Sequence, residues 1–107
     1  MSVSVPTIDR IRNLEQLYRS GYRSATVDAT IDKLLSVEVA KARQEAATLQ
    51  IRLVELETAY GISSAEFMRR FQAGEMGDSA DMFEWSAYFQ MWSSAQERVR
   101  LLEAQAV

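Results

Sequence analysis

The feature that most constrains the fold is a long stretch without helix-breaking residues. No Gly or Pro occurs between residues 22 and 60, and the stretch is dense in Ala, Leu, Glu, Gln and Arg, which favour helices. Ser24 or Thr26 can cap its beginning, and Gly61 follows its end. These signals predict one long helix over residues 25–60.

Apolar residues recur along this helix with alternating spacings of four and three, the heptad pattern of a helix that packs along another. The seam comprises Leu35, Val39, Ala42, Ala46, Leu49, Leu53, Leu56 and Tyr60. We expect four further residues to widen it: Ala40, Ala47, Ile51 and Val54. A matching seam follows at Trp85, Tyr88, Trp92, Ala95, Val99, Leu102 and Ala106. Two such seams predict an antiparallel hairpin of two long helices.

Turn and cap signals place the remaining elements. Thr7 favours the start of a helix over 8–20, which Gly21 ends. Ser63-x-x-Glu66 is a capping box that opens a connector helix over 64–73, and Asp81-x-x-Glu84 has the same spacing at the start of a helix over 82–105. Residues 2–5 alternate Ser and Val, so they form either a short strand or a frayed end. The expected fold is an all-α single domain over residues 1–107.

The amino-acid composition excludes several classes of function. The chain contains no His and no Cys, which removes Ser-His and Cys-His catalysis, imidazole or thiolate zinc sites and disulfides. We therefore expect no enzyme activity, no catalytic residue, no cofactor and no metal ion. The longest apolar runs are too short to span a membrane, and the first residues lack a signal-peptide pattern, so we expect a cytoplasmic protein.

Charge is distributed unevenly along the chain. Residues 1–23 carry four Arg against two acids, whereas residues 71–97 contain five acids and no Lys or Arg. The basic end could approach nucleic acid, and the acidic end could bind a basic protein. Such gradients also arise on ordinary solvated faces.

Aromatic and acidic residues gather in the second half. Seven of the ten aromatic residues lie between Phe67 and Trp92, beside acids that recur at every third position. These acids could simply favour the positive end of the last helix. Aromatic residues beside acids are also common anchors of protein interfaces. The predicted docking residues are Glu75, Asp78, Asp81, Phe83, Glu84 and Met91.

Two segments resemble known families. The Ser-Val-Ser-Val-Pro start, the first helix and the Gly21-Tyr-Arg-Ser24 turn resemble ribbon-helix-helix antitoxins. That resemblance implies a homodimer through residues 2–5 and promoter DNA binding within residues 1–40. The candidate DNA-binding residues are Ser2, Ser4, Arg10 and Arg23. The family usually carries Arg, Lys, Gln or Thr where this chain has the two serines.

The second resemblance covers roughly residues 30–92. The segments Tyr60-Gly-Ile-Ser-Ser-Ala-Glu-Phe67, Gly74-Glu-Met-Gly-Asp78 and Phe83-Glu-Trp-Ser-Ala-Tyr88 resemble small helical prokaryotic proteins encoded beside toxin-like genes. The implied function is an antitoxin of a type II module that neutralises a basic toxin through residues 60–107 and also regulates its own operon. The alternative is a structural coiled-coil adaptor or oligomerisation module. A one-layer core leaves apolar strips exposed, so we expect a homodimer or a hetero-complex to cover them.

Overall fold

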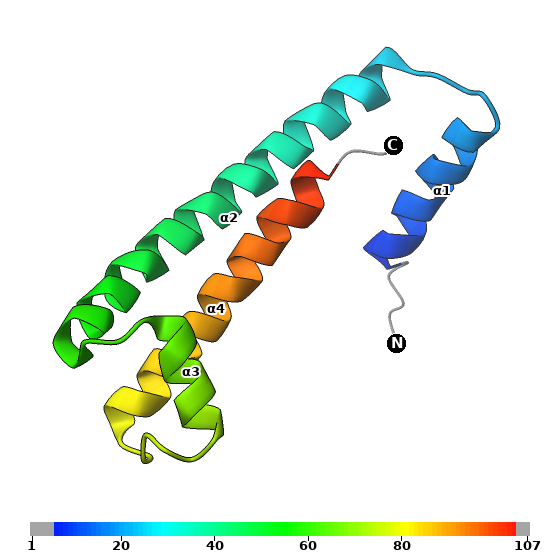
Figure 1. Cartoon of the computed structure of the whole chain (residues 1–107). Coiled ribbons are helices and arrows are strands. Elements are labelled where there is room, and N and C mark those ends of the chain that lie inside the picture. Colours follow the sequence, from blue (N-terminus) through cyan, green and yellow to red (C-terminus); the bar gives the residue numbers. More distant parts are fainter. Residues whose placement is uncertain (1–5, 105–107) are drawn as a thin grey trace, which may run out of the picture. The chain divides into compact units, whose positions relative to one another are not determined.

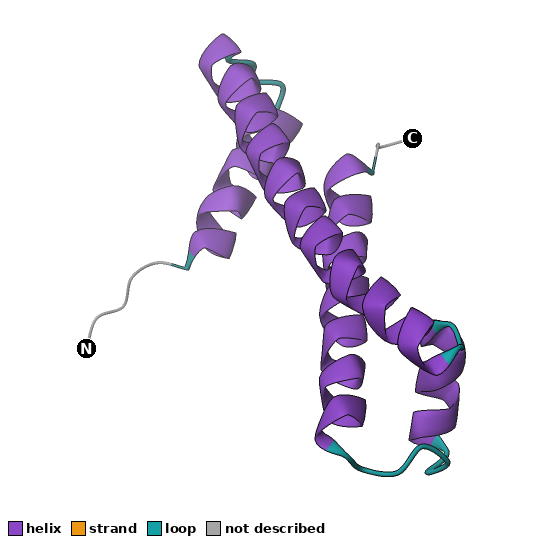
Figure 2. Cartoon of the chain, turned by 90° about the vertical axis from the view of Figure 1, so that its left-hand side faces the viewer, coloured by secondary structure: helices purple, strands orange, loops and turns teal. Residues whose placement is uncertain are grey.

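The structure is a computed structural model that describes residues 6–104. Four helices make up the ordered elements of this part of the chain: α1 (Thr7–Arg19), α2 (Ala25–Tyr60), α3 (Ser64–Gln72) and α4 (Ala80–Glu103) (Figure 1). Figure 2 shows only helices and loops among them, so the all-α prediction is confirmed. None of these four helices is long and apolar enough to cross a membrane.

The helix ends agree with the sequence signals to within a few residues, and the differences arise at the caps. α1 begins at Thr7, one residue earlier than predicted, after Pro6, which offers no side-chain cap. The hydroxyl of Ser24 accepts the N–H of Val27 at 3.3 Å, which selects Ser24 as the cap of α2. Ser63 caps α3 as predicted, since its hydroxyl accepts the N–H of Glu66 at 3.1 Å.

The predicted capping box at the start of α4 is wrong. The N-cap of α4 is Ser79, whose extended backbone lets its hydroxyl accept the N–H of Met82 at 3.3 Å. Asp81 therefore lies in the first turn of α4, where its charge favours the positive end of the helix. The predicted strand over residues 2–5 lies outside the described residues.

Two compact units divide the chain. The first ends at Lys33 and contains α1 with the beginning of α2, and the second begins at Leu34 and contains the rest of α2 with α3 and α4. In the second unit α4 runs back along α2, so the antiparallel hairpin is confirmed (Figure 1). Ion pairs link the two helices between Arg43 and Glu103 and between Arg98 and Glu45.

The hairpin fully buries the middle of the predicted seam and leaves much of the rest partly exposed. α2 contributes Ala42, Ala46, Leu49 and Leu53 as buried residues, and α4 contributes Trp85 and Ala95. The prediction is wrong at the two ends of the α2 seam, because Leu35 is 38% exposed and Tyr60 is 44% exposed. α4 ends at Glu103, beside Arg43, so its described residues do not extend along α2 as far as Leu35. Ala106 lies outside the described residues.

The main core forms where α3 joins the hairpin. Its buried residues are Leu53, Phe67, Met68, Met82 and Trp85. The Trp85 ring stacks on the Phe67 ring with centroids 4.0 Å apart, and both side chains are 0% exposed. The indole N–H of Trp85 donates to the hydroxyl of Ser64 at 2.9 Å. α3 thus completes the core at the end of the hairpin that holds Trp85, whereas small alanines occupy the seam nearer the middle of α2.

The four residues expected to widen the α2 seam are exposed, so that prediction is wrong. Ile51 is 63% exposed and Val54 is 46% exposed, and Ala40 and Ala47 are exposed as well. At 100° per residue these four residues lie on nearly the opposite side of α2 from the buried seam. They form a separate apolar face of α2.

Candidate functional site

The first unit is organised around Tyr18. Its hydroxyl donates to the carboxylate of Asp28 at 2.6 Å and accepts the backbone N–H of Ser24 at 3.1 Å. The guanidinium of Arg23 lies 5.0 Å from the centre of the Tyr18 ring and donates to the Tyr18 carbonyl at 2.9 Å. Gly21 supplies the turn with a φ of 103°, which residues with a side chain rarely adopt. Tyr18 therefore joins the end of α1 to the first turn of α2.

The Tyr18–Asp28 hydrogen bond also changes the acidity of the phenol. Hydrogen bonding to Asp28 is the main cause of a raised pKa for Tyr18, and partial desolvation adds to it. A negative carboxylate stabilises the protonated, donating form of the hydroxyl. Tyr18 is thus a neutral donor near neutral pH, with a structural role in the turn.

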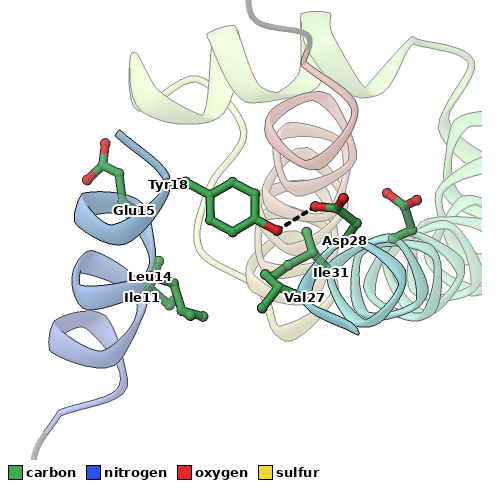
Figure 3. A pocket seen from close by; sticks show the side chains of 8 residues that line it. Ile11, Leu14, Glu15, Tyr18, Val27, Asp28 and Ile31 are labelled. Carbon is green, nitrogen blue, oxygen red and sulfur yellow. Dashed lines mark hydrogen bonds between the residues drawn. The ribbon is translucent and has the colours of Figure 1, made fainter. Parts of the chain in front are cut away.

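An open groove lies between α1 and the start of α2, as the close view in Figure 3 shows. Apolar side chains from both helices line it: Ile11, Leu14, Val27 and Ile31. Its remaining lining residues are Tyr18 and three acids, Glu15, Asp28 and Asp32, with no Lys or Arg among them. We call this surface the α1–α2 groove. It combines an apolar floor with charged side chains that are all negative.

The groove is conspicuous because α1 buries none of its side chains. Ile11 is 55% exposed, Leu14 is 38% exposed and Leu17 is 41% exposed. An amphipathic helix normally gains its stability by burying such residues against another element. The apolar side of α1 therefore has the properties of a surface that a binding partner covers.

The predicted docking residues occupy the connector and the first half of α4, and all six are exposed: Glu75, Asp78, Asp81, Phe83, Glu84 and Met91. Phe83 is 57% exposed, and its ring edge contacts Phe71 of α3 at a centroid distance of 5.6 Å. Asp81 accepts a hydrogen bond from the Tyr60 hydroxyl at 3.1 Å, and this bond is the main cause of a raised pKa for Tyr60.

These residues do not all share one patch. Met91, which is 48% exposed, lines a shallow hollow with α2 residues that include Lys41 and Thr48. Phe83 instead contacts Phe71, on the side of α4 that meets α3. The connector acids and Phe83 lie apart from the hollow that Met91 lines.

The candidate DNA-binding residues are only partly described. Ser2 and Ser4 lie outside the described residues. Arg10 is exposed on α1. Arg23 is held in the turn, where its guanidinium also donates to the Tyr22 carbonyl at 2.7 Å. Arg23 therefore has a structural role that a DNA contact would have to share.

Acidic side chains and buried polar groups are the remaining candidates for a metal site or a catalytic site. Among residues 6–104, no three acidic side chains lie close enough to hold a metal ion. The buried polar side chains in this range all have hydrogen-bond partners.

The sequence contained a signal for the α1–α2 groove that the seam pattern obscured. Apolar residues recur at helical spacing on both sides of Gly21, at Ile11 and Leu14 before it and at Val27 and Ile31 after it. Each stripe predicts a helix, and a tight turn between two such helices predicts that their stripes face one another.

Comparisons with protein-family models, with curated proteins and with solved structures found no match to this chain.

Proposed function

We propose that the protein is an antitoxin that binds and neutralises a basic toxin protein in the cytoplasm. The observation that carries the proposal is the α1–α2 groove, whose apolar floor is open and whose charged lining is entirely acidic. The resemblance of residues 60–88 to small helical antitoxins supplies the class of partner.

The groove suits an amphipathic helix that carries basic residues at its edges. Apolar side chains of the partner would pack on Ile11, Leu14 and Ile31, as in other helix-in-groove complexes. Lys or Arg at the edges would pair with Asp32, and with Glu15 in place of its exposed ion pair with Arg19. Burial of the floor supplies affinity, and the carboxylates increase the association rate with a basic protein.

The connector acids and Phe83 supply a second expected contact with the same preference for a basic partner. Residues 71–97 contain no Lys or Arg, although Arg69, just before this segment, lies close enough to Glu75 to interact with it. An exposed aromatic residue beside acids is a typical interface anchor. Both surfaces therefore favour the same kind of toxin.

The test uses the full chain together with the product of the neighbouring gene. We expect a small basic protein to co-purify and to stop growth when expressed alone. Ile11→Asp should weaken binding about tenfold or more and abolish rescue, because it places a charge on the groove floor. Gln16→Asp is the matched control, since Gln16 is exposed on the opposite side of the same helix and is not among the residues that line the groove. Equal rescue by both variants would contradict the groove as the binding surface.

The second surface needs its own variant. Phe83→Ala combined with Asp78→Lys and Glu84→Lys changes three exposed residues, so helix content should stay nearly unchanged. The variant should bind the same toxin with slower, less salt-dependent association and faster dissociation. Rescue equal to wild type would show that the connector takes no part.

Promoter binding is the regulatory part of the proposal. The ribbon-helix-helix resemblance implies that Ser2, Ser4, Arg10 and Arg23 approach DNA. Binding of the chain to its own promoter should fall steeply as salt rises, because phosphate contacts release counterions. A mobility-shift titration at two salt concentrations measures this. Promoter binding no tighter than binding to unrelated DNA would remove operon regulation from the proposal.

The structural alternative is supported by a separate observation, the exposed apolar face of α2. A helix with one buried and one exposed apolar face is typical of adaptors and oligomerisation modules. If no toxic neighbour exists and no basic protein co-purifies, this alternative replaces the antitoxin function.

A further inference from the structure

The exposed side of α2 in the second unit carries its own heptad pattern. Its positions alternate in spacing as a seam does and are Ala40, Gln44, Ala47, Ile51, Val54 and Thr58, all exposed. We call this set the outer face of α2. Ile51 and Val54, at 63% and 46% exposure, are its largest apolar side chains. A heptad seam without a partner in its own chain is the pattern of a helix that pairs with another chain.

We propose that two copies of the chain pair through the outer face of α2, in antiparallel orientation about a two-fold axis at the level of Leu49. The spacing of the outer face is the same when read in either direction, so two antiparallel copies can bring their outer faces into register. Ala47 then packs against Ile51 of the second copy, and the same contact recurs across the axis. Gln44 faces Val54 of the second copy, and Ala40 faces Thr58 of the second copy.

Side-chain size favours this orientation. Pairing Ala47 with Ile51 places a small residue opposite a large one in each central layer, so the helix backbones approach evenly. A parallel pair would instead place Ala47 on Ala47 and Ile51 on Ile51, which gives one underfilled layer and one crowded layer. Gln44 donates to the Thr48 hydroxyl of its own helix at 3.4 Å, so its amide already has a partner.

Charge complementarity supports the same register. Lys41 and Glu55 flank the outer face on one side, and in the antiparallel pair Lys41 lies opposite Glu55 of the second copy, twice per dimer. Their side chains are 69% and 58% exposed, and they now pair with Glu38 and Arg52 of their own helix. Such exposed pairs are weak and exchange easily. The two sites are therefore free to form intermolecular ion pairs.

The opposite flank carries a second complementary pair. Arg43 lies opposite Glu57 of the second copy, although Arg43 also pairs with Glu103 and Glu57 accepts the N–H of Ser64 at 2.9 Å. In a parallel pair Lys41 would lie beside Ser36, and Glu55 beside Gln50. Neither flank would then bring opposite charges together, so charge selects the antiparallel form.

The first test is the oligomeric state of the chain alone, which makes it independent of toxin binding. Sedimentation equilibrium over a wide concentration range should give twice the mass of one chain. Ile51→Glu should give a monomer with unchanged helix content, because it places a carboxylate in both central layers. Leu101→Glu is the matched control, since Leu101 is 59% exposed on α4, and should remain dimeric. A wild-type monomer at every concentration, or a dimeric Ile51→Glu variant, would overturn the proposal and leave the outer face to a different partner.

Charge reversal tests the flank. Lys41→Glu should weaken dimerisation on the order of tenfold, because two ion pairs are lost per dimer and replaced by repulsion. Adding Glu55→Lys to the same chain should restore the affinity, since the pairs reform with opposite signs. Failure of the double variant to recover would refute this register.

Spin labels test the orientation. The chain has no Cys, so Thr48→Cys or Thr58→Cys directs a label to one site. In the antiparallel pair labels at 48 lie close together across the axis, and labels at 58 are separated by roughly 27 Å along the helices. A short distance between labels at 58 would show a parallel pair and overturn the proposal.

Discussion

The hydroxyl of Ser64 is expected to contribute to stability far more than its size suggests. Ser64 is 3% exposed, and its Oγ accepts the indole N–H of Trp85 at 2.9 Å. Trp85 is 0% exposed and stacked on Phe67, so its N–H has no access to water. Ser64→Ala removes the acceptor and leaves the donor buried without a partner.

The expected cost is about 1–3 kcal/mol, the penalty for an unsatisfied buried donor. The higher helix propensity of Ala offsets at most about 0.5 kcal/mol of it. Each kcal/mol lowers the Tm of a domain of this size by about 4–8 °C. The substitution should therefore be resolved easily from wild type, although it deletes a single oxygen.

Urea unfolding followed by circular dichroism at helical wavelengths measures the change. Ser94→Ala on α4 is the matched control, because Ser94 is exposed and its free energy of unfolding should change by less than about 0.5 kcal/mol. Trp85→Phe removes the donor and completes a double-mutant cycle. In the Trp85→Phe background, Ser64→Ala should lower the free energy of unfolding much less than it does in wild type.

Two results would refute the reasoning. If Ser64→Ala unfolds at the same urea concentration as wild type, the indole N–H must find another acceptor or water. If Ser64→Ala costs the same with Trp85 and with Phe at position 85, the loss does not arise from the hydrogen bond between them.

Two further predictions concern the second unit. Trp85→Ala should cost about 3–5 kcal/mol in urea unfolding, more than Trp92→Ala, because the Trp92 side chain is only partly buried. Hydrogen bonds from Arg69 and Arg70 lower the pKa of Glu66 to about 2, below its ordinary value of 4.5. The stability this carboxylate provides is therefore complete above pH 4.5 and is lost as pH falls toward 2. Glu66→Gln should abolish this part of the pH dependence, as measured by urea unfolding across that range.

The helices and their pairing could be predicted because their signals are local. The absence of Gly and Pro between residues 22 and 60 is sufficient for α2, whose bounds match the prediction. The alternating spacing that contains Leu49, Leu53 and Trp85 identifies the sides of α2 and α4 that meet. Periodicity specifies a helix face because side chains three and four residues apart lie on the same side.

The cap of α4 shows where local signals fail. Ser79 and Asp81 are both good N-cap residues, and Asp81 has the better spacing to an acid three residues later. The backbone of the connector decides between them, and it leaves Ser79 extended and places Asp81 within reach of the Tyr60 hydroxyl. A contact between residues so far apart in sequence has no local signature.

The set of helices, the hairpin and the position of its buried seam can therefore be read from local patterns in the chain. The arrangement of the helices in space is needed to see that Ser64 accepts the Trp85 N–H and that Ile51 and Val54 face solvent. An apolar stripe shows that a surface can be buried. Which neighbour covers it, if any, depends on how the helices are arranged in space, and the spacing of residues along one helix carries no information about that arrangement.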